Sequence, residues 1–107
     1  MQTTKLVAIQ QIRLVEIGKY LLQLRQEQSI SLEQLELQTK IRRYYLEAIE
    51  RGDLSNLPPA IYVQGFIKIY ANALECDGKD LALTFPITFD KYLDTIKKTE
   101  PKYIPPA

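Results

Sequence analysis

The spacing of apolar residues predicts a helix in the first part of the chain. Residues 14–28 place Ile17, Leu21 and Leu24 on one stripe at helical spacing, with polar side chains on the rest of the circumference. Upstream, residues 3–13 continue the apolar rhythm. This upstream stretch is expected either to extend the same helix or to form a separate short helix behind a threonine cap.

A second helix is predicted to begin at Ser31. Gln34 follows three residues later and completes a capping-box pattern, in which two side chains satisfy two backbone amides at the helix start. Leu32 and Leu35 face inward at this spacing, whereas Leu37 falls off the stripe and is expected to be exposed. A helix of about two turns is too short to be stable alone, so tertiary packing must hold it.

A third helix is predicted between a turn at residues 38–40 and Gly52, which supplies the left-handed residue that ends it. Its expected buried face consists of Ile41, Tyr45, Leu46 and Ile49. Its expected outward face consists of Arg42, Arg43, Tyr44 and Glu47. Two short helices joined by a tight turn form a helix-turn-helix arrangement.

A fourth helix is predicted over residues 60–75, after a linker whose Leu54 and Leu57 are expected to plug the core. Its polar residues form one narrow strip, made of Gln64, Lys68, Asn72 and Glu75. Nearly all its other positions are apolar or aromatic. A surface helix needs an apolar arc only somewhat more than about 100° wide, so this helix carries more apolar surface than one packing partner can hide.

The aromatic side of this fourth helix is the candidate site for a protein partner. Val63, Ile67 and Leu74 are expected to be core. Four further side chains stay open between core and interface, namely Tyr62, Phe66, Ile69 and Tyr70. Tyrosine combines a large apolar body with a polar tip and suits interfaces better than dry interiors, which favours docking through this side.

A short fifth helix is predicted over residues 79–85, with Leu81, Ala82 and Phe85 turned inward. The pattern as a whole predicts an all-α fold, a five-helix bundle. We expect an N-terminal extension at 1–13, a folded domain at 14–85 and a C-terminal tail or linker at 86–107 that holds one marginal helix.

Composition argues against catalysis. The chain has 107 residues, no histidine and a single cysteine, Cys76, which fits one domain in a reducing compartment without a disulfide or a His-bearing metal site. Carboxylates at helical spacings such as Glu33/Glu36 and Glu47/Glu50 are typical of solvated helix faces, and no Gly-rich phosphate loop is present. We therefore expect a soluble intracellular protein that is not an enzyme and uses no cofactor, metal or small-molecule substrate.

The motifs of this chain, taken in order, resemble the N-terminal cytoplasmic domain of the RodZ family of bacterial cell-shape proteins. They are SLEQL at 31–35, TKIR at 39–42, YLEAIE at 45–50, GD at 52–53, LP at 57–58 and YVQGF at 62–66. The resemblance covers residues 14–85 and implies a λ-repressor-like helix-turn-helix bundle of five helices. This chain departs from the family at Glu36, where a small residue is usual, and at Arg43, where proline is common.

The same resemblance implies a protein partner, the actin-like filament protein MreB. In that family docking is chiefly through the helix corresponding to residues 60–74, and the aromatic positions involved match Phe66 and Tyr70. It also implies a cytoplasmic location at the inner face of the membrane, through a membrane-spanning segment that these 107 residues do not contain.

The third helix keeps a second hypothesis open, that of a DNA-binding transcriptional regulator. The candidate DNA contacts are Gln38, Lys40, Arg42, Arg43 and Tyr44. Residues 14–85 hold eight basic and ten acidic side chains, a net charge of −2, whereas affinity for duplex DNA comes largely from neutralising phosphates. Charge thus disfavours DNA, and self-association through the fourth helix or the N-terminal extension is a third, weaker hypothesis.

Overall fold

The computed structural model describes residues 2–87, and these form a bundle of helices, as the all-α prediction required. The elements in chain order are α1 (Gln2–Glu27), α2 (Leu32–Thr39), α3 (Arg43–Arg51), the 3-10 turn η1 (Leu54–Asn56), α4 (Ala60–Ala73) and α5 (Gly78–Leu83). The predicted marginal helix after residue 87 lies outside the described residues, and the division of the chain into 1–13, 14–85 and 86–107 stays a prediction.

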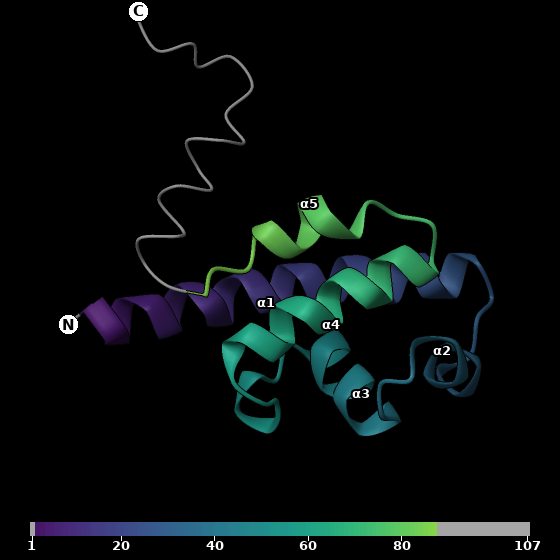
Figure 1. The fold of residues 1–107 in the computed structure, drawn as a ribbon, viewed down its shortest axis with the longest axis horizontal. Coiled ribbons are helices and arrows are strands. Elements are labelled where there is room, and N and C mark those ends of the chain that lie inside the picture. Colours follow the sequence, from purple (N-terminus) through teal and green to yellow (C-terminus); the bar gives the residue numbers. More distant parts are fainter. Residues whose placement is uncertain (1, 88–107) are drawn as a thin grey trace, which may run out of the picture.

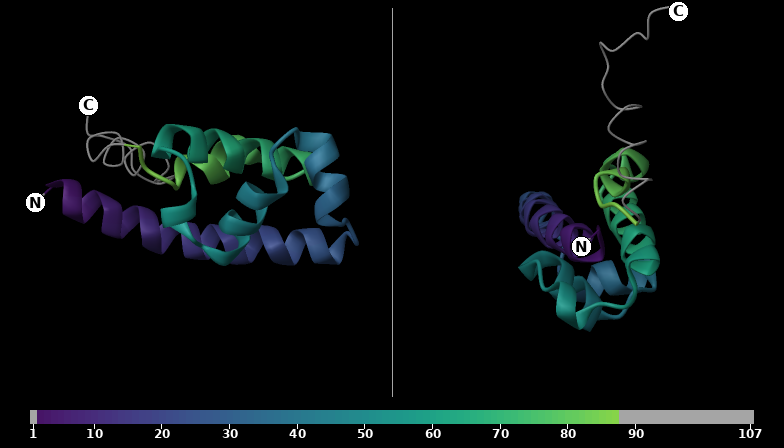
Figure 2. Two further views of the ribbon diagram at one scale, coloured as in Figure 1. Left: turned by 90° about the horizontal axis from the view of Figure 1, so that it is seen from below. Right: turned by 90° about the vertical axis from the view of Figure 1, so that its left-hand side faces the viewer.

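The helices pack around a single core. The helix α1 runs the length of the molecule, and its N-terminal end extends past the other helices (Figure 1). The helix α3 packs on α1, α4 packs on α5, and α2 contacts both α3 and α4. Seen end-on, α1 lies on one side, α4 and α5 lie on the other, and α2 and α3 join them below (Figure 2).

The first helix is continuous over 26 residues, so the upstream stretch extends it rather than forming a separate helix. Leu14, Ile17 and Leu21 are buried on its inner face. Gly18 lies where α1 crosses α3, because a Cβ at this position would collide with the carbonyl oxygen of Ile49. The glycine therefore allows two backbones to touch, which sequence spacing did not reveal.

The start of α2 confirms the predicted capping box. The Gln34 amide N–H donates to Ser31 Oγ at 3.1 Å, and the Ser31 N–H donates to Gln34 Oε1 at 2.8 Å. Leu35 is buried and Leu32 is half-buried against the core, while Leu37 is 73% exposed. The inward and outward faces of this helix are thus as predicted.

The start of α3 is capped from α2. Arg42 occupies the N-cap position and its side chain makes no cap hydrogen bond. Instead the Arg43 N–H donates to Glu36 Oε2 at 2.8 Å, and the Arg43 guanidinium lies 3.6 Å from Glu36 Oε1. The carboxylate that departs from the family pattern is therefore an acceptor for an otherwise unpaired amide at a helix N-terminus, where negative charge is favourable. At the other end, Gly52 adopts φ +67 as predicted.

The buried faces of the remaining elements agree with the apolar pattern. Ile41, Leu46 and Ile49 are buried beside α3, and Tyr45 is half-buried. The predicted core positions of α4 are confirmed, because Val63 and Ile67 are fully buried and Leu74 nearly so. The other predicted inward residues also pack on this core, namely Leu54, Leu57, Leu81, Ala82 and Phe85.

Candidate partner-binding surface

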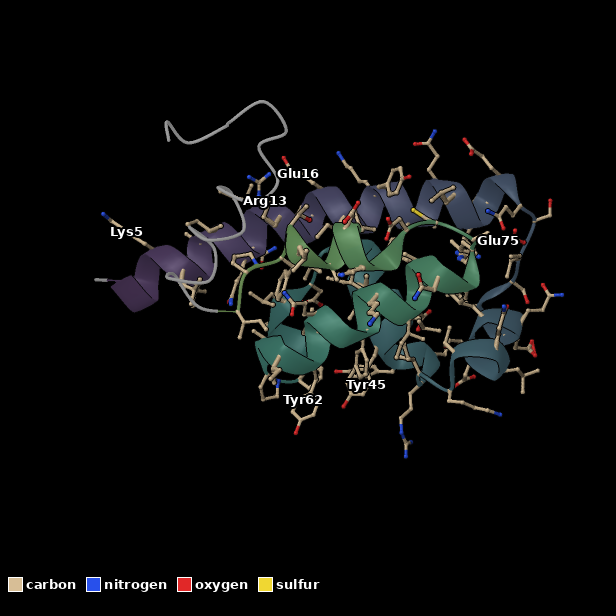
Figure 3. All side chains as sticks on the ribbon, turned by 45° about the horizontal axis from the view of Figure 1, so that its top comes forward. Lys5, Arg13, Glu16, Tyr45, Tyr62 and Glu75 are labelled. Carbon is tan, nitrogen blue, oxygen red and sulfur yellow. The ribbon has the colours of Figure 1, made fainter. Side chains whose placement is uncertain are left out.

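The solvent-facing side of α4 carries exposed apolar side chains beside the exposed polar residues Lys68 and Asn72. Ile61 is 60% exposed, Tyr62 is 59% exposed and Ile69 is 43% exposed, and Phe66 is half-buried beside them. We call these four residues the α4 surface. Tyr62 points outward from α4, on the same side of the molecule as Tyr45 of α3 (Figure 3). The excess of apolar circumference predicted for this helix is therefore left uncovered by the described residues.

A row of aromatic rings joins the α4 surface to α3. The ring centroids of Tyr45 and Phe66 are 5.6 Å apart, and those of Tyr44 and Tyr45 are 5.4 Å apart, both within the range of favourable aromatic pairs. Phe66 and Tyr45 also pack on the core. Phe66 thus belongs partly to the core and partly to the surface.

The structure corrects the prediction for Tyr70, which has no exposed surface. Its position is seven residues after Val63 and three after Ile67, so it shares their buried stripe. Its hydroxyl donates to Glu50 Oε2 at the end of a buried network. Burial, followed by the hydrogen bond to Glu50, raises the pKa of Tyr70 well above its ordinary value. Tyr70 is therefore a core residue, and its side chain does not belong to the α4 surface.

The network around Glu50 overturns a second expectation, that the Glu47/Glu50 pair marks a solvated face. The Glu50 side chain is 8% exposed and pairs with Arg25, whose Nε and Nη2 donate to its two carboxylate oxygens at 2.7 and 3.2 Å. Arg25 Nη1 also donates to the Ile30 carbonyl oxygen at 2.8 Å. The hydrogen bond to Glu50 raises the pKa of Arg25. The network joins α1, α3 and α4, and no sequence spacing links its three members.

The five candidate DNA contacts lie at the end of α2, in the turn that follows it and at the start of α3. All five are exposed, but three already have partners. Arg43 contacts Glu36, the Tyr44 hydroxyl donates to Asn56 Oδ1 at 3.0 Å, and Gln38 Nε2 donates to the Ala73 carbonyl oxygen at 3.4 Å. Lys40 and Arg42 make no ion pair with any described residue.

Within residues 2–87, no three His, Cys, Asp or Glu side chains come together as metal ligands would. None of the helices described combines the length and the apolar character needed to cross a membrane.

A comparison with protein families gives the chain its place among known proteins. A family model described as a helix-turn-helix domain matches residues 20–81, which is more than half of the chain. The chain belongs to this helix-turn-helix family. The matched segment runs from the second half of α1 into α5 and so contains every residue of the α4 surface.

Two relatives identify the domain more closely. The chain is 40% identical over 63 residues to the cytoskeleton protein RodZ of Streptococcus pneumoniae (strain ATCC BAA-255 / R6), which is 59% of this chain and 23% of that protein. It is 42% identical over 52 residues to the uncharacterized membrane protein YmfM of Bacillus subtilis (strain 168), which is 49% of this chain and 18% of that protein. The match therefore spans about a fifth of the length of these curated relatives. No solved structure matches the chain. The predicted RodZ-like helix-turn-helix domain is confirmed.

Proposed function

We propose that this RodZ-like domain is a non-catalytic adaptor that docks onto an actin-like filament protein of the MreB type through the α4 surface. One observation carries the proposal, the exposed apolar side of a helix whose opposite side is core. Burying apolar surface contributes about 25 cal/mol per Å², and large aromatic anchors commonly dominate binding energy. Tyr62 is such an anchor, flanked by Ile61 and Ile69.

The kinship with a cytoskeleton protein supports the choice of partner. An adaptor needs a rigid presenting element, and α4 is held by a buried inner face that includes Val63, Ile67 and Tyr70. Because Tyr70 is sealed, the proposed contact residues are Ile61, Tyr62, Phe66 and Ile69. We further propose a cytoplasmic location at the inner face of the membrane, in keeping with the description of one relative as a membrane protein.

The test is co-sedimentation of the 107-residue chain with polymerised MreB. A double variant, Tyr62→Ser with Ile69→Ser, should lose binding and keep its helical circular dichroism, because both side chains are exposed. Leu37→Ser is the matched control, since Leu37 is an apolar residue on α2 that is more exposed than either Tyr62 or Ile69. Filament binding that is unchanged in the double variant would refute docking through the α4 surface.

DNA-binding regulation is the second candidate function, and one observation favours it. Lys40 and Arg42 are exposed at the start of the helix that reads DNA in helix-turn-helix proteins and have no ionic partner among residues 5–87. Net charge and the pairing of Arg43 with Glu36 weigh against it. Mobility shifts at low salt decide the matter. Binding that Arg42→Ala abolishes would support DNA recognition, and the absence of any shift at micromolar protein would refute it.

A further inference from the structure

A groove runs along the side of α4 that faces α5. It encloses about 250 Å³ and is lined by Ile61, Gln64, Gly65 and Lys68 of α4 and by Lys79 and Leu83 of α5. These two helices lie side by side (Figure 1). Gln64 Nε2 donates to the Phe85 carbonyl oxygen at 2.9 Å, and the Gly78 N–H donates to Asn72 Oδ1 at 2.9 Å. The walls are therefore tied together, and the groove exists before any partner arrives.

Gly65 has no packing role within the fold. A Cβ at Gly18 or at Gly78 would strike a neighbouring backbone oxygen, whereas a Cβ at Gly65 would meet no heavy atom within 4 Å other than those of its chain neighbours and the nearby backbone of α4. Glycine in a helix interior is destabilising relative to alanine, so a helix gains nothing from it internally. Its effect is to leave the groove open, which allows another backbone to approach α4 closely.

The charged side chains that line the groove are all positive. Lys68 and Lys79 are exposed on opposite walls, and neither forms an ion pair with any described residue. The helix α4 contains no acidic residue. Ile61 and Leu83 supply apolar contact beside these ammonium groups. An occupant with an apolar face and a carboxylate side chain complements this surface, because opposite charges across an interface set specificity and register.

We propose that the α4–α5 groove receives an apolar segment of the filament partner that carries an Asp or Glu side chain facing Lys68 and Lys79, with its backbone lying over Gly65. This inference rests on the proposed function and extends it, because Ile61 belongs both to the groove and to the α4 surface. The partner then straddles α4, with aromatic anchors on the α3 side and an ionic contact on the α5 side.

Co-sedimentation with polymerised MreB tests the groove with two variants of the 107-residue chain. Gly65→Leu places a side chain in the open groove, and because the site is unobstructed and leucine favours a helix, its melting temperature should rise. The pair Lys68→Glu with Lys79→Glu reverses the charge. We expect each variant to bind filaments at least about tenfold more weakly, a change of about 1.4 kcal/mol. Lys19→Glu, exposed on α1, is the charge control and should bind like the wild type.

The outcomes separate this inference from the proposed function. If both groove variants bind like the wild type while Tyr62→Ser with Ile69→Ser does not, the proposed binding in the groove is refuted and docking through the α4 surface stands. If all of these variants bind like the wild type, both are overturned. A dimer in sedimentation equilibrium that Gly65→Leu dissociates would place a second copy of the chain in the groove and overturn the assignment to a filament segment.

Discussion

The buried network of Tyr70, Glu50 and Arg25 yields a graded prediction for stability. Tyr70→Phe removes one hydrogen bond to a charged acceptor and keeps the ring, which costs about 1.5 kcal/mol of the free energy of unfolding. Glu50 stays paired with Arg25 in this variant. Glu50→Ala leaves the Arg25 guanidinium and the Tyr70 hydroxyl without their shared acceptor. Breaking a buried ion pair costs about 3–5 kcal/mol, and the 13% exposure of the Arg25 side chain lets water reach the unpaired charge. We therefore expect Glu50→Ala to lower the free energy of unfolding by about 3 kcal/mol, the lower end of that range.

These costs are measurable by urea unfolding followed by circular dichroism. For a domain of this size, 1 kcal/mol corresponds to about 4 °C in melting temperature, so Tyr70→Phe should melt about 6 °C lower and Glu50→Ala about 12 °C lower than the wild type. Tyr70→Phe should also co-sediment with MreB filaments like the wild type, since its hydroxyl is sealed inside the bundle. The reasoning fails if Tyr70→Phe keeps full stability and loses filament binding, because Tyr70 would then be a contact residue.

Three further predictions concern single groups. The pKa of Tyr70 is raised from 10.0 in the folded state, so the contribution of its protonated hydroxyl to stability is complete below pH 10.0 and is lost as the pH rises above that value. The free energy of unfolding of the wild type should therefore fall more steeply than that of Tyr70→Phe in urea titrations from about pH 9 to about pH 11. Glu36→Ala should lower the free energy of unfolding by about 1 kcal/mol, because α3 loses its cap. An equal loss in Arg43→Ala would show instead that the stabilisation comes from the ion pair and not from the hydrogen bond to the backbone. Gly18→Ala and Gly65→Ala should have opposite effects in thermal melts. Gly18→Ala should strongly destabilise the crossing of α1 and α3, whereas Gly65→Ala should stabilise α4 by about 1 kcal/mol. A loss of stability in both variants would contradict the account of the groove.

Local signals carried much of this fold. The capping box of Ser31 and Gln34 spans four residues, so the sequence alone determined where α2 begins. Gly52 as a helix end and the stripe of Val63, Ile67 and Leu74 were readable for the same reason, because each depends on backbone conformation or helical period within one element. The excess apolar circumference of α4 was also visible in the sequence.

Contacts between distant residues decided the rest. Helical spacing places Tyr70 on the stripe of Val63 and Ile67, but the partners of its hydroxyl are distant in the sequence. Tyr70 and Glu50 are 20 residues apart and Arg25 and Glu50 are 25 apart, so only the packing of α1, α3 and α4 shows how the polar tip of Tyr70 is satisfied inside the core. Glu36 could not be recognised as the cap of α3 until α2 and α3 had their mutual orientation. Likewise, Gly18 and Gly65 look alike as helical glycines in the sequence. Only the neighbouring backbones distinguish Gly18, which lets two helices touch, from Gly65, which leaves a groove open. The effect of a missing side chain depends on which atoms that side chain would have contacted in the folded protein.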